Sequence, residues 1–248
     1  MNDPRTALVT GAASGIGLAI SRRLARDGWR VLMADRATAV LDAARALAGE
    51  GAAAAAGFVA DVGNAAGVGA LVAELGAQRI DALVNNAGIS RGRAGFDVTQ
   101  TTPDEWERVI AVNLSAPFLL SQALVPGMRA RGWGRIVNIA SRAGRTGVLT
   151  GGLPYAASKA GLIGMTRALA LQCAPQAITV NCIAPGWVET PLTGRTPPAA
   201  AAQALKAIPL GRVGQPDEIA GVVAFLCSDD AAYITGAVID ANGGSFMG

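Results

Sequence analysis

The sequence predicts a single α/β domain, residues 1–248, in which helices cover both faces of a doubly wound, Rossmann-type parallel sheet of seven strands. Short apolar runs alternate with longer helix-like stretches, as βαβ units require. Runs such as Ala7-Leu8-Val9 are apolar without alternation, which fits strands buried on both faces. No linker, charge block or internal repeat divides the chain.

Each element follows from a local pattern. Apolar runs of strand length predict strands over 5–10, 29–34, 56–60, 80–84, 134–140, 177–183 and 236–240. The stretches between them predict helices over 15–27, 38–49, 64–76, 103–130, 153–173 and 216–228. Residues 186–212 form the one long irregular segment. Loops of that length are usually functional or mobile, so this segment is expected to close over a substrate.

Composition excludes several function classes. The chain has no histidine, which removes Ser-His-Asp machinery and every histidine-ligated metal site, and no metal is expected. Its three cysteines are widely spaced and form no CxxC pattern. We expect them to be small buried residues of a protein in a reducing compartment. The arginines are scattered, so no nucleic-acid partner is indicated.

The apolar stretches 109–128 and 168–188 contain prolines and amides, which argues against membrane-spanning helices. The start of the chain lacks the long apolar run of a signal peptide. We expect a soluble, cytoplasmic protein without a membrane partner.

A glycine-rich loop follows the first expected strand. Gly11, Gly15 and Gly17 allow positive φ and close approach of a ligand to the backbone. The helix that begins there offers unpaired N–H groups to a pyrophosphate. The spacing GxxxGxG differs from the usual dinucleotide fingerprint and lacks the ending of a P-loop. A plain turn before a helix is the alternative interpretation.

Asp35 closes the second expected strand, where a carboxylate could bind the ribose hydroxyls of an adenosine and repel a 2′-phosphate. Arg36 follows and would partly offset that repulsion. The pair therefore favours NAD, with NADP as the alternative cofactor. Asp35 taken alone could equally be a surface turn residue.

Tyr155 and Lys159 lie four residues apart in an expected helix, so their side chains share one face. A tyrosine is a poor base at neutral pH unless its pKa is lowered, and an ammonium one turn away would lower it. A catalytic acid or base works best when its pKa lies near the operating pH. The alternative is an exposed pair without function.

From Thr6 to about Gly244 the sequence resembles the short-chain dehydrogenase/reductase family. The motifs that carry the resemblance are Thr10-Gly11-x3-Gly15-Ile16-Gly17, Asp61-Val62, Asn85-Asn86-Ala87-Gly88, Asn113, Ser141, Tyr155-x3-Lys159 and Pro185-Gly186-x-Val188-x-Thr190. Each motif alone is weak, whereas their ordered co-occurrence is highly specific. The resemblance implies an NAD(P)-dependent oxidoreductase.

The resemblance also implies roles for single residues. Tyr155 would be the general acid/base, Lys159 would lower the pKa of Tyr155 and hold the nicotinamide ribose, Ser141 would bind the substrate oxygen, and Asn113 would hold a water in a proton relay. Asn113 and Pro117 interrupt an otherwise apolar helix and could free backbone carbonyls. The cofactor-binding residues would be Gly11, Ser14, Gly15, Ile16, Gly17, Asp35, Arg36, Asp61, Val62, Asn86, Ala87, Gly88, Tyr155, Lys159, Pro185, Gly186, Val188 and Thr190.

The expected substrate is a small alcohol or carbonyl compound, oxidised or reduced at a secondary alcohol or ketone of the sugar, polyol or hydroxy-acid type. Segments 142–152 and 186–212 should wall its site. Arg142 and Arg145, with Arg91 and Arg93, would suit an anionic or polyol substrate, although solvated surface arginines are an equally good interpretation.

Two other functions remain open. A 3-oxoacyl-[acyl-carrier-protein] reductase is the rival within the family. Against it, the segment Ile89 to Glu105 lacks the Arg-Asp-x-Leu-Leu pattern that such reductases resemble, and Asp35 disfavours NADPH. A non-catalytic dinucleotide-binding scaffold is the rival from another class, although it would not need Asn113, Ser141, Tyr155 and Lys159 together.

The stretch Val109 to Met128 has more apolar surface than one helix needs against a sheet, and surplus apolar surface usually marks an interface. Together with the family resemblance, this favours a homotetramer.

Overall fold

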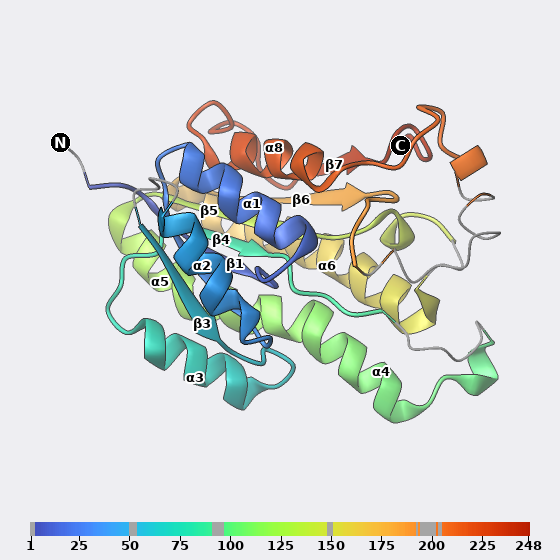
Figure 1. Ribbon diagram of the computed structural model, residues 1–248, viewed down its shortest axis with the longest axis horizontal. Helices are drawn as coiled ribbons and strands as arrows, with labels where there is room; N and C mark the ends of the chain where they lie inside the picture. The colour runs from blue at the N-terminus through green and yellow to red at the C-terminus, as the bar shows by residue number, and fades with distance from the viewer. Residues whose placement is uncertain are drawn as a thin grey trace.

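A seven-stranded, fully parallel sheet forms the centre of the molecule (Figure 1). The computed structural model describes residues 3–49, 54–90, 97–147, 151–191, 193, 202 and 205–248. The strand order is β3-β2-β1-β4-β5-β6-β7. The strands are β1 (Thr6–Thr10), β2 (Arg30–Asp35), β3 (Ala54–Val59), β4 (Ala82–Asn85), β5 (Gly134–Ile139), β6 (Ile178–Pro185) and β7 (Val238–Ala241). This architecture confirms the predicted fold class, with strand ends displaced by one or two residues.

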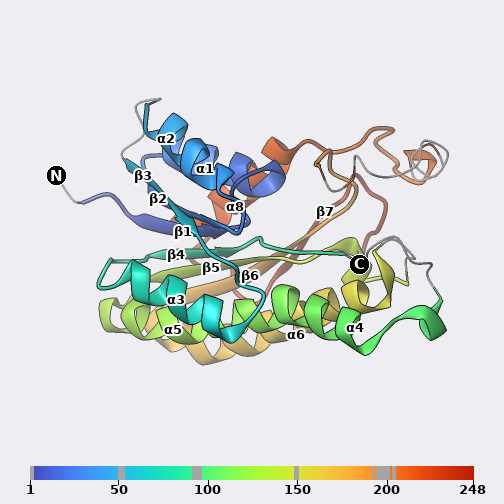
Figure 2. The same cartoon turned by 60° about the horizontal axis from the view of Figure 1, so that its bottom comes forward.

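Helices cover both faces of the sheet (Figure 2). One layer contains α1 (Gly15–Arg26), α2 (Ala39–Gly49) and α8 (Pro216–Cys227). The other contains α3 (Ala65–Leu75), α4 (Pro103–Ile110), α5 (Ala116–Arg131) and α6 (Gly152–Cys173). Alternate residues of each strand enter opposite layers: Val9 belongs to the first core cluster, and Leu8 to the second. Both side chains are fully buried, which explains why β1 shows no polar alternation.

The predicted helix 103–130 is three consecutive segments. A π-helical turn, Ala111–Ser115, separates α4 from α5. Pro117 has no N–H, so the carbonyls one turn before it lose a helical donor and the chain inserts an extra residue into the turn. The interruption expected from Asn113 and Pro117 is thus a π turn that turns Asn113 into the interior, where it is 1% exposed.

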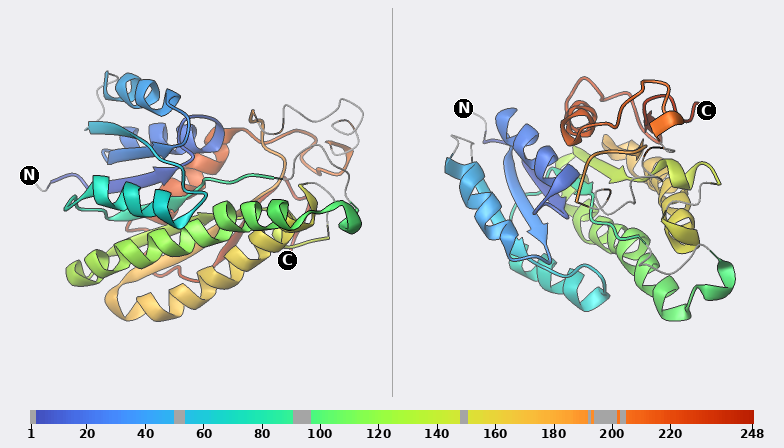
Figure 3. Two further views of the ribbon diagram at one scale, coloured as in Figure 1. Left: turned by 90° about the horizontal axis from the view of Figure 1, so that it is seen from below. Right: turned by 45° about the vertical axis from the view of Figure 1, so that its right-hand side comes forward.

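The helical stretch Pro103–Arg131 is long and apolar enough, by length and composition alone, to cross a membrane. Its most apolar window has a mean hydropathy of 1.6 and is 44% buried inside the protein. Figure 3 shows α4 and α5 running beside α6 along the same layer. The buried side of the stretch includes Leu120 and Met128, which pack in the core beneath the sheet. A helix that covers a sheet in this way has the composition of a core helix.

Candidate active site

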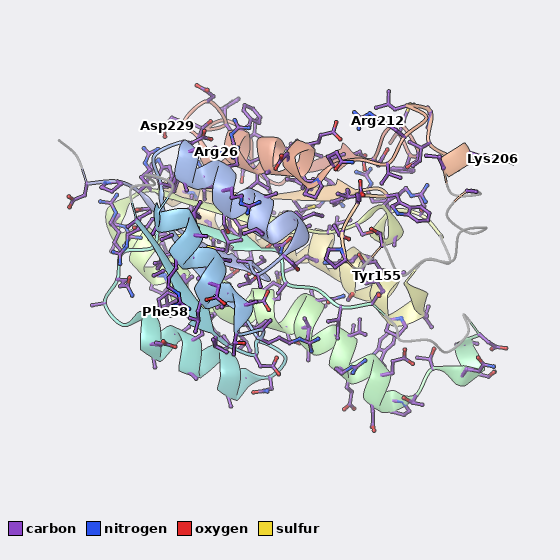
Figure 4. All side chains as sticks on the ribbon, in the orientation of Figure 1. Arg26, Phe58, Tyr155, Lys206, Arg212 and Asp229 are labelled. Atoms are coloured by element: carbon purple, nitrogen blue, oxygen red, sulfur yellow. The ribbon has the colours of Figure 1, made fainter. Side chains whose placement is uncertain are left out.

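A cleft of about 320 Å³ lies along the carboxyl edge of the sheet, where the parallel strands all end. Residues that follow six of the strands line it, from Gly11 after β1 to Thr190 after β6. The cleft spans the point where β1 lies between β2 and β4, so that successive connections leave in opposite directions. Such switch points are where open α/β sheets bind ligands. Figure 4 shows Tyr155 at this end of the molecule, where the arrow of β6 also points.

The glycine loop is shaped by two different demands. Gly11 and Gly15 have φ of +65° and +54°, the left-handed region that glycine enters freely. Gly17 does not have a positive φ, contrary to the prediction for all three glycines. A Cβ on Gly17 would lie 2.2 Å from the Gly11 carbonyl oxygen and 2.5 Å from Asn86 Nδ2. Gly17 is therefore needed for the close approach of α1 to the loop, and it does not line the cleft.

Thr10 and Asn86 hold the floor of the cleft together. The Thr10 hydroxyl accepts hydrogen bonds from the N–H groups of Asn86 (3.1 Å) and Ala87 (3.0 Å). Asn86 Nδ2 donates to the carbonyls of Thr10 (2.9 Å) and Gly11 (3.1 Å). These bonds fix the ends of β1 and β4 side by side. The glycine loop after β1 and the segment 86–88 after β4 therefore line the same cleft. Thr10 opens the glycine motif in the sequence, yet nothing local identified its hydroxyl as a clamp.

The cleft is also lined by Asp35, Arg36, Asp61 and Val62, the residues expected to bind the adenosine of a dinucleotide. Asp35 Oδ2 accepts from Ala13 N (3.0 Å), and Oδ1 accepts from Ala37 N (2.9 Å). Each carboxylate oxygen has a second lone pair, so the group can still accept ribose hydroxyls. Asp35 therefore has a structural task as well, because it ties the end of β2 to the glycine loop.

Asn113 is a hub of buried hydrogen bonds behind the cleft. Its Oδ1 accepts from Ile89 N (2.9 Å), and its Nδ2 donates to Ile89 O (2.9 Å) and to the Ser158 hydroxyl (3.0 Å). Ser158 in turn donates to the carbonyl of Tyr155 (2.7 Å). Both amide hydrogens are used, so the side chain cannot donate to the water that the family resemblance assigned to it. A water can still donate to the second lone pair of Oδ1 or to the main-chain carbonyls of the π turn, where Val112 lines the cleft, so a relay through Asn113 stays a prediction.

Tyr155, Lys159 and Ser141, the residues expected to be catalytic, line the same cleft. The Lys159 ammonium lies 5.7 Å from the centre of the Tyr155 ring and donates to the carbonyl of Ile139 (2.6 Å). Lys159 is 3% exposed. Ser141 follows β5, and its side chain hydrogen-bonds the Tyr155 phenol. The three side chains thus come from α6 and from the turn after the neighbouring strand.

The electrostatics of this group correct the prediction for the tyrosine. Burial raises the pKa of Tyr155 above its ordinary value of 10.0, and the hydrogen bond with Ser141 offsets only part of that rise. Burial also lowers the pKa of Lys159 to about 8. The protein alone therefore keeps Tyr155 a neutral phenol at pH 7. In the protein alone, any lowering of the Tyr155 pKa by Lys159 is outweighed, because desolvation acts on both groups and penalises each charged form.

Of the other residues expected to bind the cofactor or to act in catalysis, all but two line the cleft. Ser14, Ile16, Ala87, Pro185, Gly186 and Val188 all line the cleft with the residues named above. Gly17 and Asn113 lie behind it and support it. The sequence missed several lining residues, namely Thr10, Ala34, Ala60, Ile89, Val112, Ile139, Ala140, Pro191 and Thr193. Most are apolar residues, which no residue type distinguishes from the core.

The predicted arginine-lined mouth is not found at Arg142 and Arg145. Neither lines the cleft; Arg142 Nη1 donates to the carbonyl of Ser245 (3.3 Å), and Arg145 pairs with Asp240 (3.0 Å). Arg91 and Arg93 lie outside the described residues, as do 148–150 and most of 192–204 within the expected substrate loop. The two described arginines are structural because the carboxyl-terminal segment reaches them, a contact no local pattern reveals.

Known proteins resemble the whole chain. A family model described as Enoyl-(Acyl carrier protein) reductase matches residues 11–245. The 3-oxoacyl-[acyl-carrier-protein] reductase FabG of Pseudomonas aeruginosa is 44% identical over 251 residues, covering 98% of either chain. The chain is a short-chain dehydrogenase/reductase. The fold, the cleft and the ordered motifs agree with that membership, and so does the oxidoreductase class.

Two solved structures of this family show the cofactor. A putative NAD(P)-dependent gluconate 5-dehydrogenase from Beutenbergia cavernae, with bound NADP, is 40% identical with a TM-score of 0.92, covering 97% of this chain and 96% of its own. A 3-oxoacyl-[acyl-carrier protein] reductase from Brucella melitensis, with bound NAD, is 37% identical with a TM-score of 0.92, covering 98% and 92%. The cofactor of the present chain is a nicotinamide dinucleotide, NAD(P). Its cleft fits that group, because Gly11 and Gly15 line it with backbone at positive φ and the N-terminus of α1, which suits a pyrophosphate, lies there.

Replacing Gly17 by alanine should weaken nucleotide binding. The added methyl would overlap the Gly11 carbonyl, and relieving that contact costs about 1–3 kcal/mol and displaces the loop. We expect the NADH dissociation constant, measured by fluorescence titration, to rise by about tenfold or more. Gly69→Ala is the matched control: Gly69 lies in α3 with open space around it, and alanine should stabilise that helix by about 0.5–1 kcal/mol. Unchanged NADH binding by the Gly17 variant would contradict the loop geometry.

The raised pKa of Tyr155 can be measured directly. The chain has two tyrosines, so Tyr233→Phe leaves Tyr155 as the only phenol, and ultraviolet difference absorbance then reports its ionisation. Without nucleotide we expect the midpoint above pH 10, because burial disfavours the phenolate. NAD⁺ should move the midpoint down, since its nicotinamide brings a positive charge to the cleft. A midpoint below 10 in the free protein, with circular dichroism showing an intact fold, would refute the burial argument.

Proposed function

We propose that this short-chain dehydrogenase/reductase interconverts a 3-oxoacyl thioester and the corresponding 3-hydroxyacyl thioester with a nicotinamide cofactor. The observation that carries the chemistry is the meeting of Tyr155, Ser141 and Lys159 in the cleft, with the Lys159 ammonium 5.7 Å from the centre of the Tyr155 ring. A phenol that stays protonated at pH 7 is suited to donate a proton to a carbonyl, which is the direction of reduction.

Each residue has a defined task in this proposal. The bound cofactor supplies or accepts the hydride at its nicotinamide C4. In reduction, the Tyr155 hydroxyl donates its proton to the carbonyl oxygen as the carbonyl carbon gains the hydride. Ser141 hydrogen-bonds the same oxygen and lowers the energy of the charge that develops there. The phenolate left on Tyr155 is stabilised by the Lys159 ammonium and takes up a proton again from solvent.

The tuning of Lys159 supports that cycle. Its pKa of about 8 lies near neutral pH, so the ammonium predominates at pH 7 but releases a proton at modest cost. The hydrogen bond from Nζ to the Ile139 carbonyl fixes the head group beside Tyr155. Asn113 and Ser158 secure the first turn of α6 from behind. In this proposal they are positioning residues, since neither side chain lines the cleft.

The substrate class rests on relatives and on one local observation. The relative from Pseudomonas aeruginosa is named for a 3-oxoacyl substrate on a carrier protein. A sugar acid would need an anion-binding group near Ser141, and the two described arginines closest in sequence are bound to the carboxyl-terminal segment instead. A ketone flanked by an acyl chain needs no such group at the reacting end.

A sugar-acid dehydrogenase is the second candidate. It is favoured by the structural similarity to the putative gluconate 5-dehydrogenase, which covers nearly the whole chain. In that case the residues outside the described ranges, Arg91 and Arg93 among them, would have to supply the contacts to the carboxylate. Both candidates share the chemistry at Tyr155 and differ only in what lies beyond the reacting carbon.

Self-association into a tetramer is part of the proposal. Large apolar side chains remain exposed on the layer of α4, α5 and α6: Trp106 is 40% exposed, Phe118 47%, Leu153 48% and Leu171 81%. Exposed apolar residues gathered on neighbouring helices are typical of a surface that pairs with another copy. A second such copy would need to bring an equally apolar face, as a symmetric pair does.

Tyr155→Phe should abolish turnover without abolishing cofactor binding. The change removes the proton donor, which contributes about 10²–10⁴-fold to a rate, and leaves the ring in place. We expect turnover of a 3-oxoacyl-CoA or an N-acetylcysteamine thioester, followed by NADH and NADPH absorbance, to fall by about 10³-fold. Tyr233→Phe is the matched control, because Tyr233 is fully exposed.

The same assay with gluconate-type sugar acids and their keto forms separates the candidates. Faster turnover of the sugar acids would replace the thioester proposal by the second candidate. Nucleotide binding with no turnover of either class would make the chain a non-catalytic dinucleotide-binding scaffold. Retention of more than a tenth of wild-type activity by the Tyr155 variant would remove the tyrosine from the mechanism.

Asp35 should favour NAD(H) over NADP(H). The variant Asp35→Asn keeps an oxygen that can accept from Ala13 or Ala37 but loses the charge that repels a 2′-phosphate, while Arg36 stays available to attract one. We expect the ratio of kcat/KM values for the two cofactors to shift toward NADPH by about tenfold, or about 1.4 kcal/mol. Any disturbance of the glycine loop by the variant lowers kcat/KM for both cofactors and cancels in their ratio. The ratio therefore reports the effect of the Asp35 charge on cofactor preference. A wild-type preference for NADPH would show that Arg36 dominates.

A further inference from the structure

The turn that carries Ser141 packs between α6 and the carboxyl-terminal segment of the chain. It is a short 3₁₀ turn, Arg142–Gly144, in which the Ser141 hydroxyl accepts from Ala143 N (3.1 Å) and the Ser141 carbonyl accepts from Gly144 N (3.0 Å). On one side Gly144 packs onto α6, where a Cβ would lie 2.6 Å from the Lys159 carbonyl carbon. On the other side lies the carboxyl-terminal segment, residues 240–248, where the carbonyl of Ser245 accepts from Arg142 Nη1 at 3.3 Å.

Arg145 joins the turn to that segment by three contacts. Its Nη1 forms an ion pair with Asp240 Oδ2 at 3.0 Å, and its Nη2 donates to the Gly248 carbonyl at 2.7 Å. Its guanidinium lies over the ring of Phe246, 4.8 Å from the centre. The side chains of Arg145 and Asp240 are only 16% and 17% exposed. An ion pair shielded to this degree resists screening better than one at the surface.

The carboxyl-terminal segment is itself anchored next to the cofactor motif. Gly186 N donates to the Ala241 carbonyl at 3.0 Å, and a Cβ on Gly186 would lie 2.8 Å from Asn242 Cα. Leu210 N donates to the Gly243 carbonyl at 3.1 Å. Asn242 closes the segment on itself through two bonds with Phe246, at 3.0 Å and 3.3 Å. The segment therefore connects the turn of Ser141 to a fixed part of the cleft.

We propose that Arg145 is a positioning residue: by fastening the Ser141 turn to the carboxyl-terminal segment through Asp240 and Phe246, it holds the Ser141 hydroxyl at the reacting oxygen. The inference rests on the proposed function, because it needs Ser141 to act on the substrate. Arg145 does not line the cleft, so its effect must pass through Ser141. A misplacement of about 1 Å in a catalytic hydroxyl is enough to lower a rate by about 10²-fold.

A double-mutant cycle tests this coupling in the full-length protein. The variants are Arg145→Met, Ser141→Ala and the two together, with Arg145→Lys as the conservative change that keeps a charge for Asp240. Arg23→Met is the matched control, since it breaks a 3.0 Å ion pair with Asp27 on α1, away from the turn. For each variant kcat, KM and the NADH dissociation constant are measured on the substrate that the wild type turns over fastest.

We expect Arg145→Met to lower kcat by about 10–10²-fold while the NADH dissociation constant stays within about twofold. Arg145→Lys should recover part of the loss, and Arg23→Met should leave kcat unchanged. In the Ser141→Ala background, Arg145→Met should lower kcat by less than about threefold, because a hydroxyl that is absent cannot be misplaced.

Three results would overturn the inference. One is a full additional loss in the Ser141→Ala background, which means that Arg145 acts on the whole fold. Another is a kcat for Arg145→Met equal to that of the wild type. The third is an equal loss of NADH binding by Arg145→Met, since the turn would then serve the cofactor. If Ser141→Ala alone leaves kcat unchanged, the failure lies with the proposed role of Ser141, and the inference falls with it.

Discussion

The catalytic end of the cleft depends on one buried amide. Asn113 joins three parts of the chain that are distant in sequence: the loop after β4 through both backbone groups of Ile89, the π turn that carries it, and α6 through Ser158. Removing it would leave several buried polar groups without partners, at about 1–3 kcal/mol for each group. Because both its amide hydrogens and one lone pair of Oδ1 are used inside the protein, it can hold the first turn of α6, and with it Tyr155 and Lys159, at a fixed depth relative to the loop after β4.

That depth sets the chemistry. Burial disfavours the charged forms of both Tyr155 and Lys159, so in the protein alone the pKa of the phenol is raised and the pKa of the ammonium is lowered to about 8. The arrangement balances two opposing needs: a site dry enough for hydride transfer and a base strong enough for the reverse reaction. A positive charge entering the cleft would shift this balance toward phenolate. Because the oxidised dinucleotide carries that charge on its nicotinamide, we expect a lower Tyr155 pKa with NAD⁺ bound than with NADH bound.

Much of the fold and site could be predicted from the sequence because their signals are local. Buried parallel strands read as apolar runs, Gly11 and Gly15 mark a backbone with positive φ, and the Tyr155–Lys159 spacing follows from the helical repeat. What escaped prediction depends on contacts between distant segments. Arg145 meets Asp240, and Thr10 meets Asn86, only after the sheet has formed. The rise in the pKa of Tyr155 in the protein alone was not predicted, because charge proximity can be estimated from spacing whereas burial depends on the whole fold.

The central position of β1 has a consequence for how the chain reaches this state. β1 pairs with β2 on one side, but its other neighbour is β4, where Ala7 lies opposite Ala82, 75 positions later in the chain. Closing so long a loop is slow relative to the local steps that form β1, α1 and β2. During synthesis, the strand that ends in the glycine loop therefore waits with an apolar edge unpaired. This exposed edge is the part of the nascent chain most open to pairing with another molecule, and it is covered only when residues that also build the catalytic half have been made.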